Sequence, residues 1–321
     1  MTVLVTGAAG FIGYHLCEAL LARGIAVTGI DIVNDYYDVR LKEARLERLA
    51  KRAGFRFLKL DFAEHGPIMA LAGEDFSHIV HLGAQPGVRY SLINPYAYVT
   101  SNVMGHVVVL ELARRLKKLK NVVYASSSSV YGGNDKVPFS VGDPVEHPVS
   151  LYAATKRTDE LISHTYAHLY GIPLVGLRFF TVYGPWGRPD MAPFLFTQAM
   201  LKGEPIKVFN DGEMWRDFTY IDDIVAGILA AMEAPPAGKP PHKVYNLGNN
   251  KSEKLTDFIA AIESALGIKA EMRFEPMQPG DVVTTYADID ETKRVLGYSP
   301  TTPISAGVPK FVAWFRDFYR V

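Results

Sequence analysis

A glycine-rich turn near the amino terminus is the sequence feature that most restricts the fold of this chain. Residues 3–6 are apolar and predict a short strand, the spacing Gly7-x-x-Gly10-x-x-Gly13 follows at once, and a helical pattern runs over residues 12–23. Glycines at a strand-to-helix turn let the backbone bend sharply and approach a pyrophosphate, and the helix amino terminus adds amides and a partial positive charge. The spacing differs from the Gly-x-Gly-x-x-Gly of the simplest fingerprint, but the same mechanics predict a dinucleotide site here.

Strands that alternate with helices continue beyond this turn. The predicted strands cover residues 26–30, 55–60, 79–82, 121–125 and 174–177, and the predicted helices include 95–118 and 152–170. Such alternation implies right-handed parallel crossovers, so we expect an α/β fold with a doubly wound parallel (Rossmann) sheet. From Arg178 onward the elements are shorter and less regular. We therefore expect a dinucleotide-binding domain over residues 1–178 and a smaller, discontinuous α/β substrate-binding portion over 179–321, with part of 216–250 returning to the first domain.

Acidic residues at strand ends indicate which dinucleotide binds. Asp31 follows the second predicted strand, where a carboxylate can accept both ribose hydroxyls of an adenosine and would repel a 2′-phosphate. This position favours NAD over NADP as the cofactor. Asp61 and Phe62 follow the third strand and suit the adenine edge. The other residues assigned to the cofactor lie in the glycine turn, after the fourth strand and on the next helix: Phe11, Ile12, Leu82, Ala84, Gln85 and Asn102.

A serine run and a Tyr-x-x-x-Lys pair supply groups for chemistry on an alcohol. The run Ser126 to Ser129 closes the strand at 121–125, so its hydroxyls should emerge at the carboxyl end of the sheet, where open α/β sheets bind ligands. Tyr152 and Lys156 are four residues apart and leave the same face of a helix. A phenol has an unperturbed pKa of about 10, and a neighbouring ammonium stabilises its phenolate form. Hydroxyl, phenol and amine together predict proton transfer on an alcohol while a cofactor takes the hydride.

Composition and charge exclude several other classes of protein. The chain is 48% hydrophobic with a formal net charge of +0, so neither a nucleic-acid partner nor an acidic tail is expected. Cys17 is the only cysteine, which fits a reducing compartment. Met1 leads directly into the first strand, and no apolar run reaches the roughly 18 residues of a membrane span, so we expect a cytoplasmic protein. His164 and His168 share a helix face, but no third ligand is suggested and no metal site is expected.

With these motifs the chain resembles an extended short-chain dehydrogenase/reductase of the nucleotide-sugar epimerase and dehydratase group. The resemblance covers nearly the whole length and is carried by Gly7 to Gly13, Ser126 to Gly132, Tyr152 to Lys156, Arg178 to Pro185 and Arg216 to Tyr220. Within the group, residues 31–38, 87–91 and 182–191 are similar to those of UDP-glucuronate 4-epimerases. The resemblance implies an NAD-dependent isomerase that acts on a UDP-sugar without net redox change.

The resemblance also implies roles for individual residues. Tyr152 would be the base, Lys156 would hold the nicotinamide ribose, and Ser127 would bridge Tyr152 and the sugar hydroxyl. The other residues implied in substrate binding are Arg216 at the diphosphate, Phe209 on the uracil, Asp281 near the ribose and Arg89. Oxidation at carbon 4, rotation of the keto sugar and return of the same hydride would invert that carbon.

A uronate brings a particular hazard for such an enzyme. Its 4-keto form is a β-keto acid, which can lose carbon dioxide unless the carboxylate is held out of the decarboxylating geometry. Ser127, Ser128 and Ser129 offer neutral hydroxyl donors for that carboxylate, and Thr181, which stands where the group commonly has Asn, offers another. Arg188 either joins this contact or makes a diphosphate or loop-closing contact, and the sequence leaves both open.

Other functions also remain open on the sequence. The 4,6-dehydratases of the group carry an Asp-Glu pair where this chain has Ser128 and Ser129, which argues against dehydration. Decarboxylases that make UDP-xylose share most of the same motifs, and a UDP-glucose 4-epimerase and a catalytically silent nucleotide-binding module are further alternatives. In the group, a helix pair like those around Met104 and Tyr166 docks against its twin, so we expect a homodimer by analogy.

Overall fold

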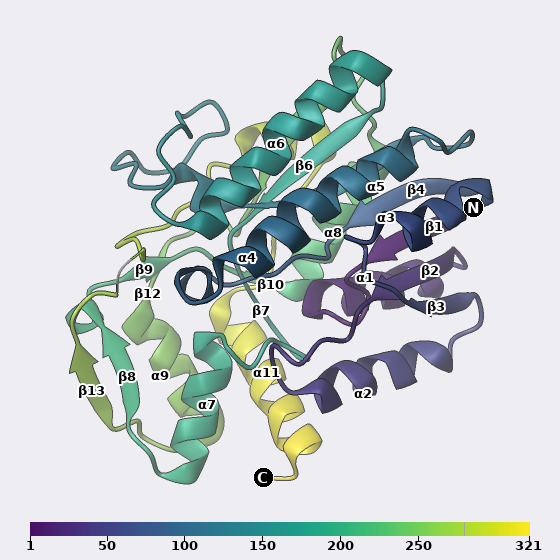
Figure 1. Ribbon diagram of the computed structural model, residues 1–321. Coiled ribbons are helices and arrows are strands. Elements are labelled where there is room, and N and C mark those ends of the chain that lie inside the picture. Colours follow the sequence, from purple (N-terminus) through teal and green to yellow (C-terminus); the bar gives the residue numbers. More distant parts are fainter. Residues whose placement is uncertain (279) are drawn as a thin grey trace.

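One parallel sheet of seven strands forms the centre of the molecule (Figure 1). The computed structural model describes residues 1–278 and 280–321. From one edge to the other the strands are β11 (His242–Leu247), β6 (Leu174–Phe179), β5 (Asn121–Ser127), β4 (Phe76–His81), β1 (Thr2–Thr6), β2 (Ala26–Asp31) and β3 (Phe55–Lys59). Every neighbouring pair is parallel. The predicted doubly wound α/β fold is therefore confirmed.

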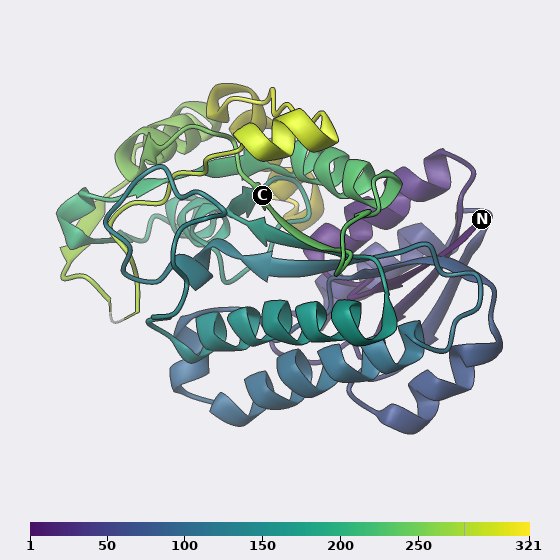
Figure 2. The same cartoon turned by 90° about the horizontal axis from the view of Figure 1, so that it is seen from above.

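Helices cover both faces of the sheet, so its central strands have buried apolar side chains on both sides. One face carries α1 (Phe11–Ala22), α2 (Val39–Ala50) and α8 (Ile221–Glu233), and the other carries α3 (His65–Met69), α5 (Gly105–Ala113) and α6 (Leu151–Tyr170) (Figure 2). Successive residues of a strand enter different cores, so that Val123 packs on the first face whereas Val122 and Tyr124 pack on the second. Both faces of the strands are thus removed from water.

The strand order reverses at β1, which has β2 on one side and β4 on the other. Ligands of open α/β sheets bind beyond the carboxyl ends of the strands at such a point. Here the loops that follow β1 and β4 come very close together, because a Cβ on Gly7 would lie 2.8 Å from the backbone nitrogen of Gly83. The topology therefore places the glycine turn at the position expected for a ligand.

The helix predicted over residues 95–118 is interrupted and shorter than expected. It consists of α4 (Pro95–Tyr98), a π-helical segment (Val99–Met104) and α5, which ends at Ala113. Single π-helical turns are frequent at functional sites, and this one contains Asn102. The prediction of one continuous helix was wrong, because a periodic apolar pattern does not distinguish π-helical from α-helical hydrogen bonding.

Several strands extend beyond their predicted ends. β4 begins at Phe76, β5 runs on to Ser127 and β6 runs on to Phe179. Ser127 pairs with Phe179 in the ladder between β5 and β6, so strand pairing overrides the weak strand propensity of the serines. Residues 128–131 then form a 3-10 turn, so the strand ends within the serine run.

The remaining elements form a smaller group on one side of the molecule (Figure 1). They are β7 (Thr181–Tyr183), α7 (Ala192–Lys202), β8 (Ile206–Phe209), β9 (Trp215–Arg216), β10 (Phe218–Tyr220), β12 (Glu253–Lys254), α9 (Leu255–Leu266), β13 (Met272–Glu275) and α11 (Ile304–Tyr319). The short strands pair as β10 with β7, β12 with β9 and β13 with β8. Two elements of this part of the chain belong with the large sheet instead: β11 is one of its strands, and α8 packs against it. Helix α10 (Asp290–Leu296) also packs against β11 and α8. The domain bounds 1–178 and 179–321 stay a prediction.

Helix α6 owes its ends to its capping residues. Ser150 accepts a hydrogen bond from the amide of Ala153 at 3.1 Å, and Gly171 ends the helix in the left-handed region with φ 66°. The helix spans 20 residues, but its outer face is polar in part. Across the described residues, no helix combines the length and the apolar character that crossing a membrane requires.

Candidate active site

The glycine turn after β1 is packed too tightly for side chains. Gly7 has φ +73°, which L side chains rarely adopt, and the amide of Gly10 donates to its carbonyl oxygen at 2.9 Å. A Cβ on Gly10 would lie 2.9 Å from that oxygen, and one on Gly13 would come closer still. Gly10 is the amino-terminal cap of α1 and supplies no side-chain cap to its amides. These amides are therefore available to an anion such as a pyrophosphate.

We expect Gly13→Ala to weaken NAD binding by about tenfold or more, because overpacking of this kind costs about 1–3 kcal/mol and separates the turn from α1. Isothermal titration with NAD measures the change. Gly66→Ala is the matched control, since nothing lies within 4 Å of the added methyl group. Unchanged NAD affinity in Gly13→Ala would show that the cofactor does not use this turn.

Asp31 faces the same cavity from the end of β2. Its Oδ2 accepts from the amide of Ala9 at 3.1 Å, and its Oδ1 accepts from the amide of Val33 at 2.8 Å. Burial raises the pKa of Asp31, and the hydrogen bond from Val33 and the charge of Lys42 oppose that rise. The carboxylate is thus fixed by the backbone of the glycine turn and keeps lone pairs for ribose hydroxyls.

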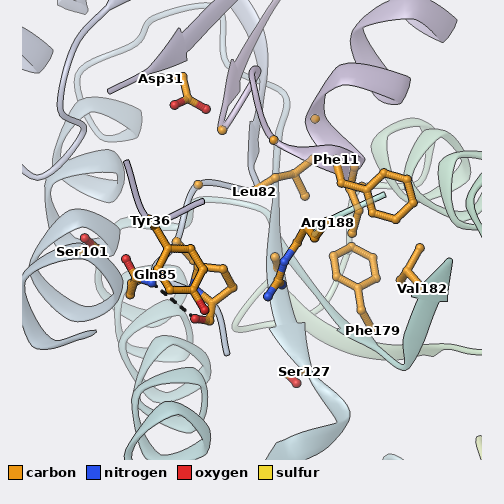
Figure 3. A pocket seen from close by; sticks show the side chains of 18 of the residues that line it. Phe11, Asp31, Tyr36, Leu82, Gln85, Ser101, Ser127, Phe179, Val182 and Arg188 are labelled. Atoms are coloured by element: carbon orange, nitrogen blue, oxygen red, sulfur yellow. Dashed lines mark hydrogen bonds between the residues drawn. The ribbon is translucent and has the colours of Figure 1, made fainter. Parts of the chain in front are cut away.

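The residues predicted to hold the cofactor line one cavity, with Asn102 as the exception. Those that line it are Gly7, Gly10, Phe11, Ile12, Gly13, Asp31, Asp61, Phe62, Leu82, Ala84, Gln85, Tyr152 and Lys156. Figure 3 shows Asp31 and Ser127 far apart in this cavity, with Arg188 between them. A cavity lined by the glycine turn and by the carboxylate of Asp31 fits a dinucleotide.

Asn102 is buried behind the wall of the cavity. Its Oδ1 accepts from the amide of Gln85 at 2.8 Å, and its Nδ2 donates to Thr155 Oγ1 at 3.0 Å. Asn102 therefore connects the loop after β4 to helix α6 and fixes the backbone of Gln85. Its predicted contact with the cofactor stays a prediction.

Tyr152 and Lys156 extend from α6 to the place where two cavities meet. Both line the cofactor cavity, and Tyr152 also lines a second cavity that contains the serine run. The Lys156 ammonium donates to the carbonyl oxygen of Ala125 at 2.9 Å and to Asp159 Oδ2 at 3.1 Å. The ring of Tyr98 packs edge-on against Tyr152 with centroids 6.1 Å apart. Phenol and ammonium therefore share one wall, as the four-residue spacing predicts.

From Ser127 onward the serine run lines the second cavity together with Tyr152. Ser127 Oγ accepts from the amide of Ser129 at 3.2 Å and from Ser129 Oγ at 2.9 Å. With two bonds accepted, the proton of Ser127 is left to donate. Ser128 and Thr181 line the same second cavity, so the four predicted hydroxyl residues are brought together.

A buried ion pair that sequence reasoning missed holds α6 against β5 and β6. Arg178 Nε and Nη2 donate to the two carboxylate oxygens of Glu160 at 2.8 and 2.9 Å, and the side chains are only 3% and 1% exposed. Ser126 Oγ donates to the same carboxylate at 2.7 Å. Burial alone raises the pKa of Glu160, but the hydrogen bonds and charge of Arg178 outweigh it and the pKa is lowered. The pair thus anchors the strand end that carries the serines.

Arg188 makes a loop contact that includes two further residues absent from the prediction. Its Nε donates to Asp190 Oδ1 at 3.0 Å, and the hydroxyl of Tyr36 donates to Asp190 Oδ2 at 3.1 Å. Burial lowers the pKa of Arg188, but the charge and hydrogen bonds of Asp190 hold it above its ordinary value. Of the roles left open, the loop-closing contact is therefore present, and the guanidinium also lines both cavities. The spacing Arg-x-Asp was the only sequence signal for the contact between Arg188 and Asp190.

Four other predicted substrate residues line the second cavity. Arg89 Nη2 donates to Asp281 Oδ2 at 2.9 Å, and its guanidinium lies 4.6 Å from the ring centroid of Phe209. Burial lowers the pKa of Arg216, the charge of Asp281 opposes this effect and that of Arg89 adds to it. Two guanidinium groups and an aromatic ring suit an anionic diphosphate and a flat base. Because Arg89 covers one face of Phe209, the uracil contact of this ring stays a prediction.

The histidines show no arrangement for metal binding. His164 packs edge-on against His242 with ring centroids 5.7 Å apart, and His168 is exposed. Within residues 1–278 and 280–321, no cluster of three or more His, Cys, Asp or Glu side chains is arranged to hold an ion.

Comparison with known proteins gives consistent similarities. The profile of the NAD dependent epimerase/dehydratase family matches residues 3–248. An uncharacterized protein of Escherichia coli O111:H- is 52% identical over 100% of both chains. UDP-glucuronate 4-epimerase 4 of Arabidopsis thaliana is 47% identical over 99% of this chain and 76% of its own. The crystal structure of UDP-glucuronic acid 4-epimerase from Bacillus cereus, in complex with UDP-glucuronic acid and NAD, is 37% identical over 99% of this chain and 100% of that chain, with a TM-score of 0.93.

Proposed function

The chain belongs to the NAD dependent epimerase/dehydratase family, and we propose that it converts UDP-glucuronate to UDP-galacturonate by 4-epimerisation. The observation that carries the proposal is that four hydroxyl residues line the same cavity as Tyr152, namely Ser127, Ser128, Ser129 and Thr181. Neutral donors next to the base suit a sugar with a carboxylate at the adjacent carbon. The similarity to UDP-glucuronate 4-epimerases across nearly the whole chain supports the same substrate.

The proton chemistry is assigned to Tyr152, Lys156 and Ser127. When bound, NAD supplies reversible hydride transfer at carbon 4 of the sugar. Tyr152 as phenolate takes the proton of the 4-hydroxyl, and the ammonium of Lys156 stabilises the phenolate. Ser127, whose Oγ already accepts two hydrogen bonds, donates toward the reacting oxygen. After the keto sugar has turned its other face, Tyr152 returns the proton and the configuration at carbon 4 is inverted.

The hydroxyl residues also protect the 4-keto intermediate. It is a β-keto acid, and it loses carbon dioxide when the bond to the carboxylate lies perpendicular to the plane of the ketone. Ser128 and Thr181 hold the carboxylate away from that orientation by hydrogen bonds. Arg188 is engaged with Asp190, so its charge is partly compensated and does not draw the carboxylate out of place.

The nucleotide part of the substrate occupies the end of the second cavity that contains Arg89 and Arg216. Both guanidinium groups can donate to phosphate oxygens. Burial lowers the pKa of Arg216 and the charge of Arg89 adds to this effect, and an anionic diphosphate between the two groups would favour their charged forms. Phe209 and Asp281 complete the site for the base and the ribose.

Product analysis by NMR after incubation with UDP-glucuronate and NAD tests the function. We expect UDP-galacturonate and no release of carbon dioxide. A UDP-pentose would identify a decarboxylase instead, and turnover of UDP-glucose in preference to UDP-glucuronate would identify a neutral-sugar epimerase. If no UDP-sugar turns over while NAD still binds, the chain is a silent nucleotide-binding module.

We also propose that the protein is a homodimer. Apolar side chains are exposed on α4, on α6 and on the π-helical segment, which lie side by side in Figures 1 and 2. They are Tyr96, Val99, Met104, Leu161 and Leu169, with 81, 51, 53, 53 and 61% exposure. Exposed apolar side chains on neighbouring helices are suited to an isologous contact with a second copy. Light scattering should give twice the chain mass, and a single chain mass would contradict the proposal.

A further inference from the structure

A third titratable side chain lies on the catalytic face of α6. Tyr152, Lys156 and Asp159 follow one another at intervals of four and three residues, which places all three on one stripe of the helix. Lys156 Nζ and Asp159 Oδ2 are 3.1 Å apart, and their side chains are only 4% and 2% exposed. Asp159 is thus the only carboxylate within ion-pair distance of Lys156 in the described part of the chain.

The carboxylate of Asp159 depends on this one contact. Its second oxygen, Oδ1, is buried and has no hydrogen-bond partner among the described residues. Burial raises the pKa of Asp159 to about 6, and the charge and hydrogen bond of Lys156 oppose the rise. A buried carboxylate with a single partner is costly for stability, which indicates that its charge has another role.

The titratable groups that face this ion pair from neighbouring strands and helices are either neutral or already paired. Burial lowers the pKa of His81 on β4 to about 3 and lowers that of His106 on α5 as well, so both rings are neutral. Burial raises the pKa of Tyr124 on β5, so its phenol is neutral too. Glu160, which follows Asp159 on the helix, is engaged by Arg178 of β6. The local field at Lys156 is therefore set mainly by Asp159.

We propose that Asp159 is a positioning residue that acts through Lys156: it holds the ammonium in place beside Tyr152 and sets the pH range in which the Tyr152–Lys156 pair works. The proposal deepens the proposed function and rests on it, because it requires Tyr152 and Lys156 to be the acid–base pair. Asp159 itself touches neither cavity.

The effect of removing the charge has a definite sign. A negative charge favours the protonated form of every group near it, the phenol as well as the ammonium. Without it, the phenolate forms at lower pH and the ammonium also loses its proton at lower pH. Both limbs of the pH–rate profile therefore move to lower pH. A loss of packing, by contrast, lowers the rate without moving the pH optimum.

The test compares Asp159→Asn, which keeps the shape and removes the charge, with the parent protein. We expect the pH optimum of kcat to move down by about one unit, since a charge at this range shifts a neighbour by about 1–3 pH units. Asp217→Asn is the matched control: that carboxylate is equally buried, its pKa is also raised to about 6, and it accepts from the backbone of Asn249 and Ala287 instead. It should leave the optimum in place. An unmoved optimum in Asp159→Asn, or one moved to higher pH, overturns the proposal.

A second measurement needs no substrate and separates this proposal from the proposed function. Phenolate absorbance is followed against pH in the NAD complex, and the contribution of Tyr152 is the part that Tyr152→Phe removes. We expect its midpoint to fall by about one unit in Asp159→Asn and to be restored by Asp159→Glu. A midpoint that does not move refutes the role of Asp159, even if UDP-glucuronate is epimerised. A shifted midpoint without any epimerisation supports Asp159 and refutes the proposed substrate.

Discussion

Tyr152→Phe is expected to lower kcat by about 10²- to 10⁴-fold, the usual contribution of a general acid–base group. The change removes only the hydroxyl, so the ring can still pack edge-on against Tyr98 and helix α6 keeps its cap at Ser150. Without the hydroxyl nothing accepts the proton of the sugar 4-hydroxyl, and Ser127 lacks the basicity to replace it. The rate loss should therefore appear in kcat, with little change in NAD binding.

Steady-state epimerisation assays and NAD titration of the same preparations measure the two effects. Tyr166→Phe is the matched control, because it removes a tyrosine hydroxyl from the same helix that bonds Glu111 at 2.9 Å, away from the cavities. Its turnover should equal that of the parent. Near-normal turnover in Tyr152→Phe would mean that another group is the base.

Glu160→Gln is expected to lower the free energy of unfolding by about 3–5 kcal/mol, the usual cost of removing one partner of a buried ion pair. Arg178 would then keep its charge at 3% exposure without a carboxylate, and the hydrogen bond of Ser126 would change its acceptor. Urea denaturation followed by circular dichroism measures the loss. Because Ser126 directly precedes Ser127, which we propose to take part in proton transfer, turnover should fall as well.

The pH dependence of this loss follows from the lowered pKa of Glu160. A carboxyl group with a depressed pKa stabilises the fold above its ordinary pKa, and the stabilisation is lost as the pH falls through the value in the folded protein. The difference between parent and variant should therefore be full at neutral pH and shrink in acid. Glu47→Gln is the control, since its pair with Lys51 is exposed and removal should not be measurable. A loss as small as that of Glu47→Gln would contradict the structural role of the buried pair.

The sequence was informative where one local segment contains the whole signal. The glycine turn, the position of Asp31 and the Tyr152–Lys156 spacing each occupy a few consecutive residues, and backbone geometry alone places their groups. The sequence was less informative at strand ends, because Ser127 becomes part of β5 only through pairing with Phe179. It also missed the π-helical segment that contains Asn102, since hydrogen-bond register leaves no clear trace in apolar periodicity.

The contacts that sequence reasoning missed either join residues that are distant in the chain or depend on burial. Arg89 and Asp281 are 192 positions apart, and Tyr36 and Asp190 are 154 apart, so only the folded chain brings them together. Asp159 lies close in sequence to Lys156, yet its spacing alone did not reveal a buried pair. Its importance comes from burial and from the neutral state of His81 and His106.

By itself, then, the sequence determined the fold class and the cofactor and predicted the reactive groups, because these depend on local backbone conformation and side-chain chemistry. Only the tertiary structure decided which charges face those groups and which are already paired. Electrostatic interactions depend on distance and burial, and both are set when β5, β6 and α6 pack together.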